Sequence, residues 1–234
     1  MSGLRRVLVT LTTLTTALLF AATAHAQATG TKPAPRTKRA KQFLVGGLFT
    51  GPSSVGSASA ELLNGAGTPS VTLFDARNKI ASGFGIESNV GVQLASSLWF
   101  EVSGGFTRAN VNTEISNDFE NADALTISSA MSRFTVEGGV VMYFNQTGSR
   151  ALFFRGTGGW MRETAGGNTL TGDGYIASAG IGVRQWFGGN SGRATKRVGL
   201  RIEGRAVVRS GGISLAEKGV RFGPAGAVHL VFGL

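Results

Sequence analysis

The sequence predicts an all-β chain that folds as one eight-stranded antiparallel barrel. Three observations favour this fold class. Gly accounts for 36 of the 234 residues, about double its usual share. Charged residues make up only 15%, which is low for a soluble surface. Eight segments alternate apolar and polar residues with a period of two, as half-buried strands do. A helical bundle is excluded because each Gly inside a helix costs about 0.5–1 kcal/mol relative to Ala.

The expected strands are separated by connections that alternate in length. The strands lie near 43–51, 82–92, 97–108, 131–144, 151–163, 174–187, 196–208 and 222–233. The longer connections are 52–81, 109–130, 164–173 and 209–221, and the shorter ones are 93–96, 145–150 and 188–195. Membrane barrels have this pattern, with short periplasmic turns and longer extracellular loops. The first strand alternates poorly around Gly46 and Gly47, so its facing stays open.

The first residues have the features of a secretory signal peptide over 1–26. Arg5 and Arg6 precede an apolar run, and an A-x-A motif ends at Ala26. A membrane-anchoring helix is the alternative, but the run is short for a span of about 20 residues. We therefore expect cleavage near Ala26 and export toward the outer membrane of a Gram-negative cell.

Two further segments follow the expected signal peptide. Residues 27–42 form a basic, Pro-containing segment that cannot build a core, so we expect a flexible, solvated stretch. Nucleic-acid binding is not expected there, because a secreted protein rarely meets nucleic acid. Residues 43–234 form the barrel domain. The chain has no Cys, which excludes disulfides and thiol catalysis.

The two faces of the strands differ in chemistry. In the strand near 97–108, Phe100 and Val102 share one face, while Glu101 and Ser103 share the other. A soluble lipocalin-like barrel turns the apolar face inward, and a membrane barrel turns it toward lipid. Two observations favour lipid. All six Lys lie outside the strands or at their ends. Aromatic residues flank the apolar face in pairs, namely Phe100/Phe106, Phe134/Phe144, Phe154/Trp160, Tyr175/Phe187 and Phe222/Phe232.

The complete fold prediction is therefore an eight-stranded antiparallel transmembrane β-barrel with short periplasmic turns and longer extracellular loops. Its lumen is expected to hold matched charges, because buried charges must be paired. The expected network consists of four Glu and four Arg: Glu87, Glu101, Glu137, Glu203, Arg155, Arg184, Arg201 and Arg205. Eight strands leave a lumen that side chains can fill, so a closed interior is expected. A narrow solute or ion channel remains the alternative.

At this level the chain from Phe43 to Leu234 resembles small bacterial outer-membrane barrels of the OmpA/OmpX type. The resemblance rests on the strand layout, the Glu/Arg interior and the segments 174–184 and 199–205. It implies no enzyme activity and no cofactor, with roles ranging from structural anchor to adhesin. The chain end is similar to the insertion signal that the barrel-assembly machinery reads. Its alternating residues are Val228, Leu230, Phe232 and Leu234, with Leu at the last position.

Catalysis has little support in the sequence. After cleavage the chain keeps one His, His229, which is expected to face the lumen. A His-based hydrolase needs an oriented nucleophile and a carboxylate beside it. One His without Cys also gives no metal constellation. A lipid-modifying outer-membrane enzyme is therefore the weakest of three functional hypotheses, after a non-enzymatic envelope or surface-interaction protein and a narrow channel.

The loops and rim carry the remaining expectations. Residues 71–74 alternate and are expected to extend the barrel above the membrane. The acidic residues of the 109–130 loop lack the spacing of a calcium loop. Lipopolysaccharide contact, or ordinary solvation, is expected for five Arg near the extracellular strand ends, because Arg binds phosphate bidentately. They are Arg108, Arg133, Arg162, Arg209 and Arg221. The expected partners are thus outer-membrane lipid, lipopolysaccharide and, during insertion, the assembly machinery.

Overall fold

The computed structural model describes residues 39–63, 69–116, 123–144, 149–167, 169–187, 198–213 and 219–234. The expected signal peptide and most of the basic segment lie outside these residues. The described residues form ten strands: β1 Lys41–Thr50, β2 Ser53–Leu63, β3 Pro69–Ile80, β4 Gly83–Gln93, β5 Leu98–Ser116, β6 Leu125–Phe144, β7 Arg150–Ala165, β8 Leu170–Phe187, β9 Val198–Gly211 and β10 Val220–Gly233. Within the described ranges, no helix has the length and hydropathy to cross a membrane.

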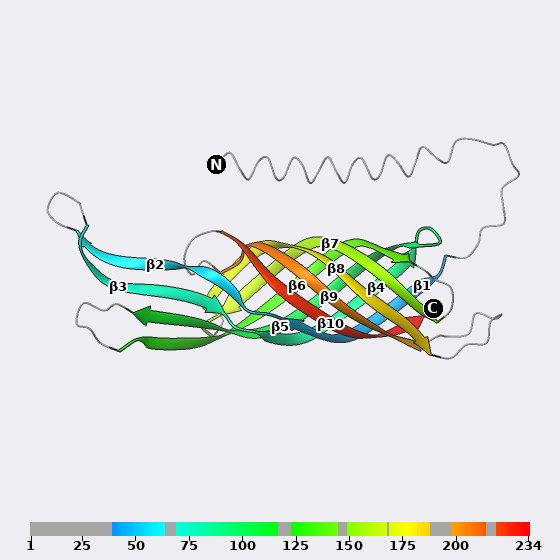
Figure 1. Cartoon of the computed structure of the whole chain (residues 1–234), viewed down its shortest axis with the longest axis horizontal. Helices are drawn as coiled ribbons and strands as arrows, with labels where there is room; N and C mark the ends of the chain where they lie inside the picture. Colours follow the sequence, from blue (N-terminus) through cyan, green and yellow to red (C-terminus); the bar gives the residue numbers. More distant parts are fainter. Residues whose placement is uncertain are drawn as a thin grey trace, which may run out of the picture. The chain divides into compact units, whose positions relative to one another are not determined.

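Eight of these strands close into a ring. The order is β5-β4-β1-β10-β9-β8-β7-β6, every pairing is antiparallel, and β5 pairs with β6 to complete the circle. Figure 1 shows these strands tilted and wrapped around one barrel. Closure removes the free edges that an open sheet would expose. The predicted eight-stranded antiparallel barrel is confirmed.

The barrel wall continues beyond one end as a sheet of four strands. β2 and β3 form a hairpin outside the ring, and Asp75–Ile80 of β3 pairs with Val111–Ser116 of β5. The upper part of β5 pairs with β6 as far as Leu125. Figure 1 shows β2 and β3 running out past the barrel beside the green ends of β5 and β6. We call this part the extension. The expectation that 71–74 lengthen the barrel is confirmed, because they belong to β3.

Two of the expected long loops are therefore mostly strand. Residues 52–81 hold β2 and β3, and residues 109–130 hold the ends of β5 and β6. The sequence pattern missed them because both faces of the extension meet water. All of Leu125–Ser128 is exposed, so no apolar face marks the strand. The connection expected at 164–173 is also shorter, since β7 and β8 meet through a turn with Gly166 and Gly167 at φ 59° and 66°.

The first and last strands close the barrel tightly. β1 pairs with β10 along its length, and the Leu234 amide donates to the Lys41 carbonyl at 2.9 Å. A Cβ atom at Gly46 would lie 1.9 Å from the carbonyl oxygen of Val228, so only Gly fits there. The facing of the first strand is now defined. Leu44 and Leu48 are buried inside, whereas Phe43 and its alternate neighbours lie outside.

The outside of the barrel is apolar and the inside is charged. Phe100 and Val102 are exposed on the outer surface, as are Phe134 and Trp160, while Glu101 between the first two is fully buried. A water-soluble protein buries its apolar residues and exposes its charges. This barrel does the reverse, with its buried charged side chains gathered in the interior. The functional residues must therefore be sought inside the barrel and at its outer end.

Candidate functional site: the barrel interior and outer rim

The lower interior holds an ion-pair network centred on Arg155, which β7 points into the lumen. Its Nη1 lies 3.3 Å from Oε1 of Glu87 and 3.4 Å from Oε1 of Glu203, and its Nε lies 3.7 Å from Oε2 of Glu101. The other terminal nitrogen, Nη2, donates to the Asn89 side-chain oxygen at 3.2 Å and to the Ser103 hydroxyl at 3.0 Å. One guanidinium thus links carboxylates from three strands.

Two Arg residues of β9 complete this network. Nη1 of Arg201 donates to both oxygens of Glu101, at 2.7 and 3.0 Å, and its Nη2 donates to Glu203 at 2.8 Å. Arg205 binds Glu87 bidentately, with distances of 2.6 and 2.7 Å, and donates from Nε to Glu203. Each carboxylate therefore meets at least two Arg, and Glu203 meets three, which is the dense pairing that a buried charge requires. We call these six charged residues the lower network.

His229 lies at the edge of the lower network and is fully buried. Its Nε2 is 3.2 Å from Oε1 of Glu87 and 3.3 Å from Nδ2 of Asn89. The lumen position expected from the sequence is where the structure places it. Burial leaves this imidazole without access to a substrate, and no Ser hydroxyl is among its hydrogen-bond partners in the described residues.

Two members of the expected network stand apart from it. Glu137 has no ion pair within 4.0 Å among the described residues, and instead its Oε2 accepts a 2.6 Å hydrogen bond from the Thr157 hydroxyl. Arg184 donates to the Gln42 side-chain oxygen at 3.2 Å and lies 3.8 Å from the ring centre of Tyr143. A cation over an aromatic face is stabilised by the ring quadrupole. Neutral partners thus stand in place of a guanidinium at Glu137 and in place of a carboxylate at Arg184.

A second charged group lies nearer the extension. Arg133 donates from Nε and Nη2 to Oε1 of Glu163 at 2.9 and 2.7 Å. Arg221 donates to Oε2 of the same carboxylate at 3.3 Å, and so does the Ile213 amide, at 3.2 Å. Arg209 lies beside them, but neither its Nη1 nor its Nη2 has a hydrogen-bond partner in the described residues. We call Arg133, Glu163, Arg209 and Arg221 the upper cluster.

The upper cluster corrects the expectation for the rim. Arg133, Arg209 and Arg221 were expected at extracellular strand ends, where they would meet lipopolysaccharide. They point inward instead and are buried, so lipid phosphates cannot reach them. The side-chain parity of each strand contains this information, because Arg133 shares its face with Glu137 and Arg209 shares its face with Arg205. Parity also places Glu163 on the inner face, although the sequence-based prediction of the network did not include it.

The interior charges do not balance when both groups are counted. Among the described residues, the buried side chains include seven Arg but only five Glu. The sequence reading paired four of each because it assigned the upper Arg residues to the rim. The upper cluster accounts for this excess, since it holds three Arg and one Glu. Arg stays charged in proteins, so the excess is a real charge and not a protonation choice.

Apolar side chains close both ends of the interior. Trp99, Tyr143 and Phe153 form a buried cluster with Val141 and Ala151 at the end that holds Arg184. A second cluster lies where the barrel meets the extension, and its members are Val55, Ile80, Val111, Met131, Ala165 and Ile213. The charged groups lie between these two apolar layers. The charged interior is thus bounded by apolar side chains at both ends in the described residues.

The outer rim keeps two exposed Arg residues. Arg162 forms a salt bridge with Asp173, with Nε 2.8 Å from Oδ1, and stacks over Trp160 at 5.4 Å. Hydrogen bonds from Arg162 hold the pKa of Asp173 below its usual value. Arg108 lies over Phe106, 5.7 Å from the ring centre, and has no ion pair within 4.0 Å among the described residues.

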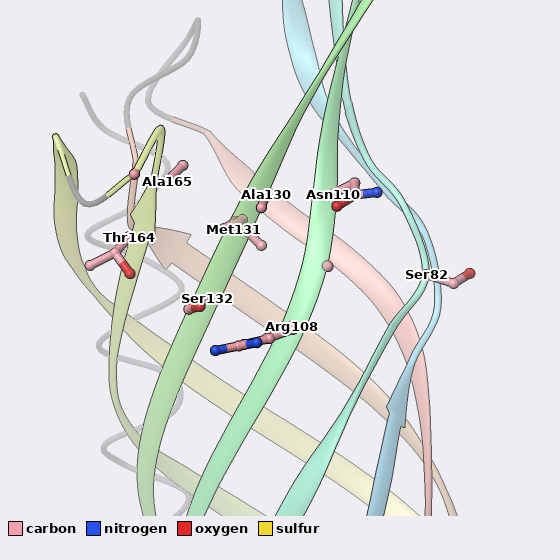
Figure 2. A pocket seen from close by; sticks show the side chains of 10 residues that line it. Ser82, Arg108, Asn110, Ala130, Met131, Ser132, Thr164 and Ala165 are labelled. Carbon is pink, nitrogen blue, oxygen red and sulfur yellow. The ribbon is translucent and has the colours of Figure 1, made fainter.

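Arg108 borders a groove of about 490 Å³ at the rim, beside the start of the extension. Figure 2 shows its guanidinium reaching toward Ser132 on the neighbouring strand, with Thr164 and Asn110 around the same hollow. Ser132 pairs directly with Arg108 and with Thr164, so the three form one row across β5, β6 and β7. A cation without an ion partner beside hydroxyl groups can bind a ligand with an anionic oxygen.

The structure also gives the positions of the C-terminal residues and of the acidic loop residues. Val228, Leu230 and Leu234 are exposed on the outer face of the last strand, and Phe232 is half-buried there. Of the acidic loop residues, Glu114 lies on β5 and Asp123 precedes β6, while Asp118 and Glu120 lie outside the described residues. No group of three or more His, Asp or Glu is arranged to hold a metal ion in the part of the chain that the structure describes.

No known family and no curated protein matches the sequence. The chain is similar to Neisserial surface protein A, with a TM-score of 0.47, 11% identity, and coverage of 82% of this chain and 96% of that one. It is also similar to outer membrane protein OprG from Pseudomonas aeruginosa, with a TM-score of 0.47, 9% identity, and coverage of 84% and 97%.

A third similar structure is the outer membrane protease OmpT from Escherichia coli. Its TM-score is 0.38 at 7% identity, with coverage of 88% of this chain and 99% of that one. Two of the three proteins are named as outer-membrane proteins. None of the three is named as a barrel of the OmpA/OmpX type. At such identities the likeness concerns the course of the chain and not its site residues.

Proposed function

We propose that this chain is a non-enzymatic integral outer-membrane β-barrel, closed by its own side chains, that presents the extension at the cell surface. The observation that carries the proposal is the inverted distribution of side chains. Apolar residues cover the outside of the ring, and paired charges fill the inside. An outward apolar band with a polar interior is the pattern of membrane barrels.

Aromatic residues support a membrane position for the ring. On β6 the exposed Phe134 and Phe144 flank Val136 and Val140, and other strands of the ring repeat this pattern. Aromatic side chains prefer the two membrane interfaces, and aliphatic ones prefer the hydrocarbon between them. Beyond this band, toward the extension, the exposed pair Arg162 and Asp173 lies where water and headgroups begin.

A closed lumen is favoured over a channel. Eight strands enclose a space that side chains can fill. Here the cavity between the two charged groups has a volume of only about 20 Å³. Apolar clusters close the space above and below it. The enzyme alternative is disfavoured by the burial of His229, whose partners are Glu87 and Asn89.

The extension supports a role in surface interaction. Between Leu125 and Ala130, β6 pairs on one side with β5, and on its other side it has no strand partner among the described residues, because β7 stops opposite Met131. This edge carries no charge and no Pro, the usual devices that block edge-to-edge pairing. An uncharged free edge is a surface to which an extended peptide can add a strand.

The groove at Arg108 supports contact with lipopolysaccharide. Arg108 lies two residues beyond Phe106 on the same outer face of β5, so a lipid phosphate at the interface comes within its reach. We expect Arg108→Met to weaken binding of lipopolysaccharide to the purified barrel. We expect Arg162→Met to have a smaller effect, since Arg162 is already engaged by Asp173. Equal losses for both variants would contradict a specific role of Arg108.

A matched pair of substitutions on β6 tests the membrane position. Val140 and Ile127 are similarly exposed, at 45% and 50%, but only Val140 lies within the apolar band. Val140→Arg is expected to cost about 2–4 kcal/mol of folding free energy in lipid vesicles, the figure for a cation near the bilayer midplane. Ile127→Arg should leave it nearly unchanged. A soluble barrel would tolerate both changes equally.

Cell fractionation provides a second test. The wild-type protein should occur in the outer-membrane fraction and should migrate differently on SDS gels before and after boiling, as closed barrels do. Protease added to intact cells should cut within the extension and leave the ring protected. Recovery from the soluble periplasm with no mobility shift would contradict the proposal, and a secreted barrel with an apolar ligand would replace it.

A further inference from the structure

We propose that the barrel interior binds a small monovalent anion, of the size of chloride, at Arg209 in the upper cluster. The ion would supply negative charge in an interior where, among the described residues, buried Arg outnumber buried Glu by seven to five. It is distinct from the groove on the outer rim, because the two Arg residues point to opposite sides of the wall.

The first observation is the state of Arg209. This side chain is only 1% exposed, yet both of its terminal nitrogens lack a hydrogen-bond partner among the residues that the structure describes. A buried guanidinium that is neither paired nor hydrogen-bonded is costly, because desolvation is not repaid. The other buried Arg residues of the upper cluster, Arg133 and Arg221, share the single carboxylate of Glu163. Arg209 is therefore the one cation of the upper cluster that has no ion-pair partner in the described residues.

A second donor without a partner lies beside Arg209. The Ser53 hydroxyl is buried and has no hydrogen-bond partner within the described ranges. A Cβ atom built on Gly223 would lie 3.2 Å from Nη2 of Arg209 and 3.7 Å from Cβ of Ser53. The Pro52 carbonyl oxygen lies 3.6 Å from the same position. Two buried donors thus lie close to a residue without a side chain, which is a setting for an acceptor-only ligand.

The third observation is the cavity that Arg209 borders. It has a volume of about 20 Å³ and is also lined by Arg133, Arg205, Thr50, Thr107, Thr135 and Glu137. A space of this size holds one water-sized species. It is therefore too small for sulfate or phosphate, whereas a halide ion fits. Ser178 also borders the cavity, so hydroxyl groups from four strands line it. Thr157 and Ser178 already donate to the Glu137 carboxylate.

The charge count gives the reason for an anion rather than a neutral water. Arg205 is paired with Glu87 and Glu203, so it adds no unpaired charge to the cavity. The Glu137 carboxylate also lines the cavity, and with it counted the buried Arg residues still outnumber the buried Glu residues by seven to five in the described part of the chain. The charged groups that act on Arg209 are Arg133, Arg221 and Glu163, two cations against one anion. A water molecule would satisfy the hydrogen bonds but leave the charge. A monovalent anion satisfies both.

The test compares anions of two sizes on the purified, folded full-length barrel in detergent. Urea unfolding is followed in sodium chloride, in sodium bromide and in sodium gluconate at equal ionic strength. The wild-type midpoint should rise with halide in a saturable way, by on the order of 1 M urea at 100-fold excess over the dissociation constant. Gluconate, which is too large for the cavity, should produce no rise.

Variants locate the effect. Arg209→Met should abolish the halide shift. Arg155→Met removes an equally buried guanidinium from the lower network, and the halide shift should survive in it even if the midpoint falls. An anomalous-scattering peak in crystals grown in bromide should lie within hydrogen-bonding distance of Arg209 and should vanish in Arg209→Met.

Three outcomes would overturn the proposal. The first is an equal halide shift in wild type and Arg209→Met, which would place the ion elsewhere. The second is no halide shift and no bromide peak in wild type. The third is a halide shift that arises only in Glu217→Gln. Glu217 lies outside the described residues, and this last result would identify its carboxylate as the partner of Arg209 in place of a bound ion.

Discussion

The two charged groups inside the barrel differ in how completely carboxylates pair their buried Arg side chains. In the lower network three Arg face three Glu, and each carboxylate meets at least two guanidinium groups. In the upper cluster three Arg surround Glu163 alone. The lower network is redundant, because loss of one contact leaves others. The upper cluster depends on one carboxylate and leaves Arg209 unpaired.

The difference shows what a paired interior and an unpaired one can do. Redundant pairing fills space and fixes geometry, which suits a plug that keeps the lumen shut. An excess of cations creates a demand for a negative ligand, which suits a binding site. Both groups lie in the same enclosed interior, so the environment does not explain the contrast. The number of carboxylates does.

The largest effect is expected when the upper cluster loses its only carboxylate. Glu163→Gln would leave three buried guanidinium groups without an ion partner. Breaking a buried pair on one side costs about 3–5 kcal/mol. The measurement is the free energy of unfolding by urea in detergent. A loss smaller than that of Glu203→Gln would show that the stability of the upper cluster does not depend on Glu163.

A smaller loss is expected for Glu203→Gln in the lower network. Its three partners, Arg155, Arg201 and Arg205, keep the carboxylates of Glu87 and Glu101. The cost should therefore approach that of a lost charged hydrogen bond, about 1.5–3 kcal/mol. The same unfolding experiment compares the two Gln variants directly, and a reversal of their order would contradict the redundancy of the lower network.

Arg209→Met should change stability with the opposite sign when halide is absent. In gluconate the variant removes an unpaired buried charge, so the free energy of unfolding is expected to rise by about 1–3 kcal/mol. In saturating chloride this gain should shrink, because the wild type then has its ligand. A stability loss in gluconate would mean that Arg209 has a partner that the described residues do not include.

The smallest effect is expected on the outside of the wall. Arg162 and Asp173 form a well-aligned pair, but both side chains are about half exposed. Exposed ion pairs contribute little because water screens them. Arg162→Met should therefore leave the urea midpoint almost unchanged. A drop comparable to that of Glu203→Gln would show that this pair is shielded from water. Arg162 and Asp173 would then have to be grouped with the buried charges.

The sequence predicted the ring and the facing of its strands because one face is apolar and the other polar over most of each strand. It predicted the positions of Glu87, Glu101 and Arg201 by the same parity. The extension was missed where both faces meet water and the alternation disappears, as at Leu125–Ser128. Arg133 and Arg209 were misplaced because nearness to a strand end was given more weight than side-chain parity.

The sequence did not predict which side chains of distant strands come into contact. The partnership of Arg155 with Glu87, 68 residues away, depends on the stagger of the ring. The shortage of carboxylates around Arg209 likewise becomes visible only when the strands are assembled. Alternation defines which residues point inward, whereas the register between strands decides which of them meet.

The central claim is that paired charges and apolar layers close a barrel whose outside faces lipid. Conductance in planar lipid bilayers tests this most directly. The purified wild-type protein, shown to be inserted by its heat-dependent gel mobility, should give no stepwise currents at either polarity. Stable single-channel steps that change in size or ion selectivity in Arg155→Met would contradict the claim, and the lower network would then be the lining of a pore.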